Sequence, residues 1–320
     1  MPIKIRIMGS GPSSGVPSIK CRLSGGCQVC KTVRRTNVSI LITKYHLTDS
    51  GSQEIIGSVL IDCGKHFFDQ FNEYLNIVDV DFKKDRLVNP IETKKNVNLL
   101  LNIENLSNQT LEKSEIVQEN IKDSDQRRVD LIPDLILTHP HADAISGIDT
   151  YLMMNNGAMP LFCDKFTFTL LKESFKYFFR EPSLKRVRSF FTEEKSTILK
   201  DNLTFKAGNM TFKSFEMLHG RCTAMAFLIE GKALYISDCS EITENQLEYF
   251  RKLSLKFLFI DCLALSGYNI GHLNLEDVKK YVARIKPEHV ILVGCSHEIP
   301  NVKKLDDFFV SYDGMEIDIE

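Results

Sequence analysis

Two histidines and an aspartate stand within five residues, directly after an apolar run that reads as a strand. The segment is His139-Pro140-His141-Ala142-Asp143, and it follows Leu135-Ile136-Leu137-Thr138. Side chains alternate along a strand, so His139 and His141 can point to one side, and Asp143 can reach the same space from the loop beyond. Imidazole and carboxylate groups are typical zinc ligands. The segment therefore predicts a metal site at the end of a buried strand.

Short apolar, β-branched runs recur along the chain and predict strands. They cover residues 3–8, 38–43, 58–61, 135–138, 211–218, 224–229, 233–236, 257–260 and 290–293. Segments with helical spacing lie between several of them, at residues 66–78, 166–179, 244–253 and 275–285. This interleaving favours an α/β sandwich over an all-β barrel. The region from about 82 to 129 is rich in Asn, Lys, Glu, Ser and Gln, and we expect a flexible polar insertion there.

Composition narrows the class of protein. The chain has 320 residues, 43% of them hydrophobic, which is enough for a large core, and its formal charge of −2 gives no overall attraction to nucleic acid or anionic membrane. It shows no apolar stretch that could cross a bilayer and no signal peptide, so we expect a cytoplasmic protein without a membrane partner. The nine cysteines favour reduced thiols and a metal over a disulfide framework.

Polar residues follow the predicted strands at several further places. They are Asp62, His219, Asp238 and the segment Gly294-Cys295-Ser296-His297. Strand ends that gather at one rim can hold such groups on a rigid frame. We therefore expect them to share one site with the histidine motif.

This ordered series resembles the metallo-β-lactamase superfamily. The opening segment Gly9-Ser10-Gly11-Pro12-Ser13-Ser14-Gly15-Val16-Pro17, the three nearby cysteines and Gly271-His272-Leu273 resemble one branch in particular. That branch contains the phosphoribosyl cyclic phosphate phosphodiesterase of phosphonate breakdown and uncharacterised eukaryotic members. The resemblance implies a four-layer αβ/βα sandwich, a single domain over residues 1–320, with a metal site on one edge.

The resemblance also implies a ligand set for the catalytic metal. His139, His141 and His219 would bind one ion, and Asp238 would bridge towards a second. The second ion normally uses Asp143, a His at the position of Ala144 and a His at the end of the last strand, where this chain has Gly294. Asp143 and Asp238 alone would hold zinc poorly but could accept a harder ion such as Mn²⁺. We therefore expect one catalytic Zn²⁺ and a second ion that is absent or exchangeable.

A separate structural Zn²⁺ is expected from the same branch. Cys27 and Cys30 form a two-thiolate clamp, and Cys21 lies in the same short loop. Closed zinc sites have four ligands, and the resemblance supplies His297 as the fourth. A rival role for His297, as a ligand of the catalytic ion, stays open at this point.

This ligand set predicts hydrolytic chemistry. Zinc held by three neutral histidines, with one position open, can lower the pKa of water from about 15.7 to about 7. Asp143 could orient the water or accept its proton, and His272 could donate a proton to the leaving oxygen. Asp62 could fix the tautomer of a ligand histidine from outside the set of metal ligands. The alternatives without a chemical role are that Asp238 caps a helix and that His272 only precedes one.

The sequence thus predicts a zinc-dependent hydrolase, a phosphodiesterase acting on a small phosphorylated or cyclic phosphate substrate. Two alternatives stay open: an RNA 3′-end processing nuclease, against which the lack of a basic surplus counts, and a catalytically reduced scaffold protein. The turn Ser13-Ser14-Gly15 and the basic run Lys185-Arg186-Val187-Arg188 could each bind phosphate or be ordinary surface. A homodimer is also left open.

Overall fold

The computed structural model of the chain describes residues 1–49, 51, 53–84, 132–154, 157–179, 191–267 and 269–319. The expected polar insertion at about 82–129 lies outside these ranges apart from its first three residues. The basic run at 185–188 also lies outside them.

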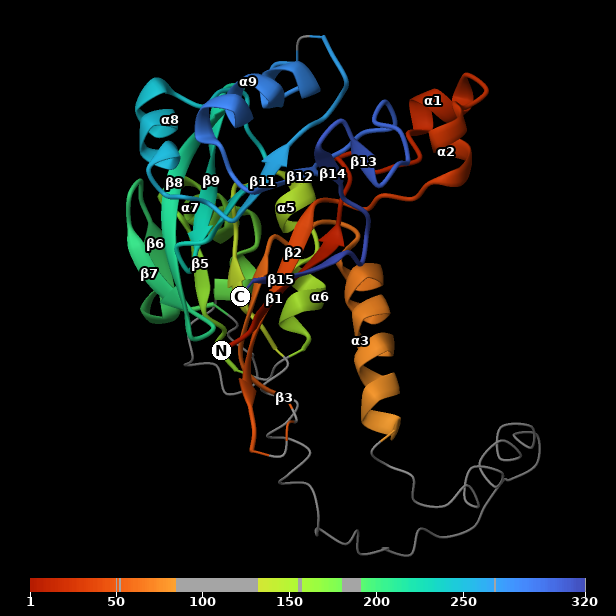
Figure 1. The fold of residues 1–320 in the computed structure, drawn as a ribbon. Helices are drawn as coiled ribbons and strands as arrows, with labels where there is room; N and C mark the ends of the chain where they lie inside the picture. The colour runs from red at the N-terminus through yellow and green to blue at the C-terminus, as the bar shows by residue number, and fades with distance from the viewer. Residues whose placement is uncertain are drawn as a thin grey trace, which may run out of the picture.

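Two mixed sheets lie face to face in the described part of the chain (Figure 1). The first has the order β15-β1-β2-β3-β4-β5-β6 and consists of β1 (Ile3–Gly9), β2 (Ser39–Leu47), β3 (Gln53–Ile61), β4 (Asp134–Ile136), β5 (Leu161–Asp164), β6 (Ser196–Leu199) and β15 (Glu316–Ile319). The second has the order β13-β14-β12-β11-β10-β9-β8-β7 and consists of β7 (Thr204–Ala207), β8 (Met210–His219), β9 (Cys222–Ile229), β10 (Ala233–Ile236), β11 (Phe257–Asp261), β12 (His289–Val293), β13 (Lys304–Leu305) and β14 (Phe308–Val310).

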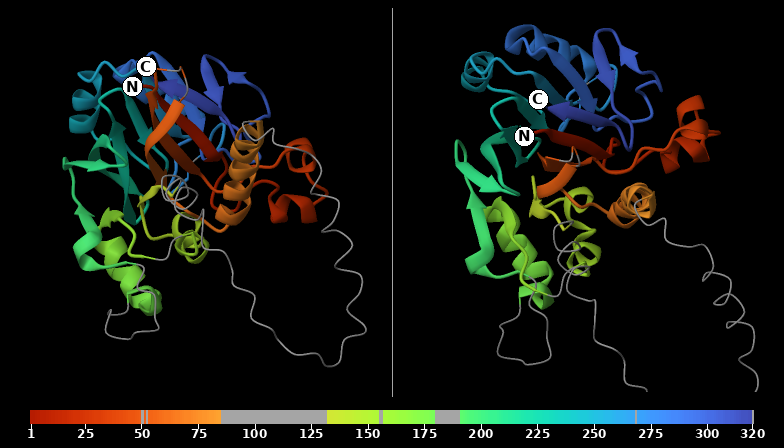
Figure 2. Two further views of the ribbon diagram at one scale, coloured as in Figure 1. Left: turned by 90° about the horizontal axis from the view of Figure 1, so that it is seen from below. Right: turned by 60° about the horizontal axis from the view of Figure 1, so that its bottom comes forward.

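Helices cover the outer faces of both sheets. The first sheet is covered by α3 (Phe67–Lys84), α5 (Ala142–Ile145), α6 (Ile148–Leu152) and α7 (Lys165–Ser174), and the second by α8 (Glu244–Arg251) and α9 (Leu275–Ile285). Figure 2 shows α8 and α9 (cyan to blue) and α7 (green) on opposite sides of the paired sheets. The expected four-layer α/β sandwich is therefore confirmed.

Three apolar clusters account for the layers. One lies between the sheets and consists of strand residues such as Ile5, Ile40 and Phe259, each fully buried. A second joins the outer face of the second sheet to α8 and α9, and a third joins the first sheet to α3, α6 and α7. Burial of each apolar face contributes about 25 cal/mol per Å², so a sheet gains most when both of its faces are covered.

Several strands end at one rim of the sandwich. Strands β10, β11 and β12 are parallel, and β3 runs parallel to β4, so their carboxyl ends point the same way within each sheet. The two sheets meet there, because the Cys295 N–H donates to the Ser10 carbonyl at 2.9 Å. Polar residues that follow these strands thus come from both sheets.

The sequence pattern located most of the long elements closely. Residues 233–236 and 275–285 match β10 and α9 residue for residue. The short helices α1 (Ile19–Leu23), α2 (Gln28–Thr32), α5 and α6 were not predicted, because four or five residues are too few to show a helical period. Within the described residues, no helix is both long and apolar enough to span a bilayer.

Candidate metal centre

Three imidazoles from distant parts of the chain converge at this rim. His139 follows β4, His141 precedes α5, and His219 ends β8. Their ring centroids lie 4.6 to 5.2 Å from one another, and one nitrogen of each ring lies within 4.8 Å of the others. The structure thus brings together the trio that the sequence predicts as metal ligands.

The tautomer of His139 follows from its neighbours. The Thr138 hydroxyl donates to Asp62 Oδ2 at 2.7 Å, so its oxygen accepts from His139 Nδ1 at 2.8 Å. His139 Nε2 then carries a lone pair, and this buried atom has no hydrogen-bond partner. Burial lowers the pKa of His139, which favours the neutral ring that a metal ligand needs. Asp62 therefore acts on His139 through Thr138, and not by direct contact.

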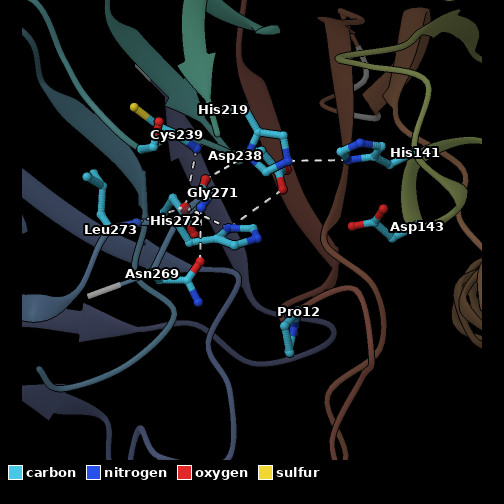
Figure 3. Close-up of polar contacts among 12 residues, drawn as sticks. Pro12, His141, Asp143, His219, Asp238, Cys239, Asn269, Gly271, His272 and Leu273 are labelled. Atoms are coloured by element: carbon cyan, nitrogen blue, oxygen red, sulfur yellow. Dashed lines mark hydrogen bonds and ion pairs between the residues drawn. The ribbon is translucent and has the colours of Figure 1, made fainter. Parts of the chain in front are cut away.

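His219 is oriented in the same manner. Its Nδ1 lies 2.6 Å from the carbonyl of Gly271, and a carbonyl only accepts, so Nδ1 carries the hydrogen and Nε2 a lone pair. His219 Nε2 lies 3.3 Å from His141 Nδ1 (Figure 3). A hydrogen on His141 Nδ1, or a cation between the rings, would satisfy both atoms.

Two carboxylates complete this centre. Asp143 Oδ1 lies 4.0 Å from His139 Nε2, and Asp143, Asp238 and His139 form a second group of ligand atoms within 4.8 Å. Asp238 Oδ2 is buried without a hydrogen-bond partner. A bare carboxylate oxygen and imidazole nitrogen buried together are costly unless a cation lies between them. The donor set therefore fits a divalent metal ion.

His272 faces the same space from the opposite side (Figure 3). Its Nδ1 lies 2.9 Å from Asp261 Oδ2 and 3.8 Å from Asp238 Oδ1. Burial alone would lower the pKa of His272, but Asp261 and Asp238 outweigh it and raise that pKa to about 9. Burial raises the pKa of Asp261 to about 6, against the opposing effect of His272. The buried Asp261 carboxylate therefore favours a hydrogen on His272 Nδ1.

The two positions where the resemblance implies further histidines carry Gly294 and Ala144 in this chain. Gly294 has φ +69°, and a Cβ there would lie 2.9 Å from Asp261 Oδ1. Ala144 is buried in the apolar cluster beneath the first sheet. A larger side chain at position 294 would therefore collide with Asp261. Asp261 instead occupies the space beside the end of β12.

A second group of metal-binding side chains lies away from the imidazoles. One ligand atom each from Cys21, Cys27, Cys30 and His297 lies within 4.8 Å of the others, with 3.5 Å between Cys27 Sγ and His297 Nδ1. The backbone N–H of Cys30 lowers the pKa of the Cys27 thiol to about 6, with His297 adding to the effect. The structure places His297 here, with the cysteines, and not among the three imidazoles. Three thiols and one imidazole suit a closed tetrahedral zinc site.

The family of the chain follows from a match that includes the three imidazoles, Asp143 and Asp238. A family model described as a beta-lactamase superfamily domain matches residues 110–294, which is more than half of the chain. The chain belongs to the metallo-β-lactamase superfamily. The family resemblance inferred from the sequence is thus confirmed, and the superfamily is largely hydrolytic.

Solved structures of this superfamily show the same fold. A diphosphatase from the PhnP family shares 21% identity, covers 100% of this chain and 98% of its own, and has a TM-score of 0.65. Zinc-bound PqqB from Methylobacterium extorquens shares 15% identity, with 99% and 100% covered and a TM-score of 0.60. The short form of human tRNase Z shares 12% identity, with 98% of both chains covered and a TM-score of 0.53.

A curated sequence relative is longer than this chain. It is an octanoyltransferase from Porphyromonas gingivalis, 22% identical over 330 residues, which cover 98% of this chain and 51% of the relative. This chain therefore spans about half the length of the curated relative that it matches.

Sequence reasoning missed four groups at this centre: Thr138, Asp261, Cys222 and the Gly271 carbonyl. Asp261 follows a predicted strand just as Asp238 does, so the same strand-end signal could have found it. Thr138 and Cys222 lie within three residues of a predicted ligand. The Gly271 carbonyl carried no signal, because every residue has a backbone oxygen.

Proposed function

We propose that this protein is a metal-dependent hydrolase of small phosphate esters, most specifically a phosphodiesterase for phosphorylated or cyclic phosphate substrates. The observation that carries the proposal is the convergence of the His139, His141 and His219 nitrogens beside His272, whose Nδ1 pairs with the buried Asp261. A Zn²⁺ held by these three nitrogens would polarise a phosphoryl oxygen and make a water molecule more acidic at neutral pH.

The surrounding residues have complementary roles in the proposed reaction. Asp143, at the edge of the centre, would orient the attacking water and accept its proton. His272 would give the proton on Nε2 to the leaving oxygen, since its Nδ1 is held by Asp261. Donor and acceptor lie on opposite sides of the space (Figure 3), as an in-line displacement at phosphorus requires.

The proposed metal content is one catalytic Zn²⁺, one structural Zn²⁺ at the cysteine group, and a weak second catalytic ion such as Mn²⁺. Support for weak binding comes from Gly294 and Ala144, which leave the second position mainly to Asp143 and Asp238. Oxygen ligands suit Mn²⁺ better than zinc, and fewer ligands give lower affinity.

The test is hydrolysis of bis(p-nitrophenyl) phosphate by the full chain, stripped of metal and then given Zn²⁺, with or without Mn²⁺. We expect turnover to return with Zn²⁺ and to change modestly with added Mn²⁺. No turnover with any metal would contradict the proposal and favour the scaffold alternative. Cleavage of a precursor transfer RNA, with none of the small diester, would instead favour RNA 3′-end processing.

A further inference from the structure

Cys222 differs from the other cysteines in its surroundings. Six of the nine are buried, and Cys21 and Cys27 belong to the group around His297. Cys222 is half-buried at the start of β9, and its Sγ lies 3.8 Å from His141 Nε2. Neither the family pattern nor the proposed mechanism gives this thiol a role.

The position of Cys222 is fixed by the β8–β9 hairpin. His219 and Cys222 are directly paired across the two strands, and Gly220, with φ +62°, lies in the two-residue turn between them. Directly opposed residues have Cβ atoms about 4.5–5.5 Å apart, so the thiol must lie beside this ligand. The hairpin therefore places a sulfur next to two of the three imidazoles.

The contacts of Cys222 favour one tautomer of His141. The S–H group donates to the His219 carbonyl at 3.2 Å, which leaves the sulfur lone pairs as acceptors. In the tautomer that leaves His141 Nδ1 free for a metal, Nε2 carries the hydrogen, and Sγ lies where it can accept that hydrogen. His141 Nδ1 is left with a lone pair, directed at the space it shares with His219 Nε2.

This completes a pattern across the trio. His139 donates from Nδ1 to Thr138, and His219 donates from Nδ1 to Gly271. Histidines that bind a metal through one nitrogen usually donate from the other, and loss of such a partner typically weakens metal binding or activity by about 10–100-fold. His141 is the most exposed of the three rings and has no carbonyl or hydroxyl partner in the described structure.

We infer that Cys222 is a positioning residue of the metal centre: its sulfur accepts from His141 Nε2 and holds Nδ1 ready to bind the metal. The inference rests on the proposed function only in taking the imidazole trio as a metal site. Of the three groups that accept hydrogen bonds from the imidazoles, the Cys222 thiol forms the weakest bond, since sulfur is a weak acceptor.

The test uses the full chain with Cys222→Ala, Cys222→Ser and, as a matched control, Thr223→Ala. Thr223 is the next residue of β9, and its side chain points to the other face. Zinc affinity at the imidazole trio is measured by competition with a chromophoric chelator. We expect Cys222→Ala to weaken binding about 10–100-fold, Cys222→Ser to restore part of it, and Thr223→Ala to have no effect.

A second readout needs no metal. Long-range ¹H–¹⁵N spectra of the metal-free chain report which nitrogen of His141 carries the hydrogen. We expect a larger share of the Nε2–H form in the unaltered protein than in Cys222→Ala, where the competing hydrogen bond from His141 Nδ1 to His219 Nε2 is unopposed. Equal affinity together with an unchanged tautomer would overturn the inference. An unaltered protein that binds no metal at the trio would refute the proposed function instead, and the tautomer would still decide the role of Cys222.

Discussion

The two groups of metal-binding side chains are built from different parts of the fold. The imidazole trio stands on segments that follow β4 and at the end of β8, against the core, and His139 is only 1% exposed. The cysteine group lies on α1 and α2, two five-residue helices, and its fourth member, His297, comes from the loop after β12. One group relies on the rigid core, whereas the other is held by short local segments that a metal would tie together.

The donors differ as well. Nitrogen and carboxylate donors with outer hydrogen-bond partners keep a ligand position free for chemistry, whereas three thiolates and one imidazole fill a tetrahedral shell. Metal at the first group should therefore govern reaction rate, and metal at the second should govern stability.

The largest effect is expected for His219→Ala. Loss of one of three ligands should reduce hydrolysis to the rate of the metal-free protein and remove one equivalent of bound zinc. The cysteine group should keep its own equivalent, and the melting temperature should change little. Activity and zinc content are measured on the same sample. Retention of both hydrolysis and the full zinc content would contradict the assignment.

A smaller loss of rate is expected for His272→Gln. A positioned acid contributes about 10²–10⁴-fold to rate, so kcat should fall by that order while zinc content stays constant. His289→Gln serves as the control, because His289 is an exposed histidine at the opposite end of β12. If kcat is unchanged while KM rises, His272 binds substrate and donates no proton.

The cysteine group should respond in the opposite way. Cys27→Ser should lose one zinc equivalent and lower the melting temperature by about 10 °C, as expected for a loss of a few kcal/mol. Residual activity per folded molecule should stay within a few-fold of the unaltered protein, and Gln28→Ala should leave both quantities unchanged. A collapse of kcat at unchanged stability would erase the distinction between the groups.

The smallest effect concerns Arg35, which holds the loop that carries His297. This buried guanidinium donates to the carbonyls of Ser296, Ile299 and Pro300 at 2.6, 3.0 and 3.2 Å. Arg35→Met would leave buried acceptors unpaired, at a cost of about 1–3 kcal/mol, and lower the melting temperature by about 5 °C. It should also weaken zinc retention at the cysteine group.

The neighbouring arginine offers a matched control for that prediction. Arg34 is 53% exposed and pairs with Asp69 and Glu73 on the surface. Surface ion pairs contribute about 0–1 kcal/mol, so Arg34→Met should leave the melting temperature nearly unchanged. Equal losses from the two substitutions would mean that Arg35 does not secure the loop.

The sequence predicted features that repeat or that lie in a motif. Strand β10 and helix α9 were found because apolar spacing marks a buried face, and His139, His141 and Asp143 were found because they are adjacent in the chain. The carbonyl of Gly271 and the closure of position 294 by Asp261 depend on tertiary contacts, which no local pattern encodes. Asp62 was expected beside a ligand histidine, but its contact through Thr138 depends on the tertiary structure.

The most direct test of the account is anomalous X-ray scattering from crystals of the full chain, recorded at the absorption edges of zinc and manganese. We predict one zinc peak among His139, His141 and His219 and a second among the three cysteines and His297, with any manganese peak near Asp143 and Asp238. A refined map with no anomalous peak among the three imidazoles, from crystals grown with zinc, would contradict the central claim.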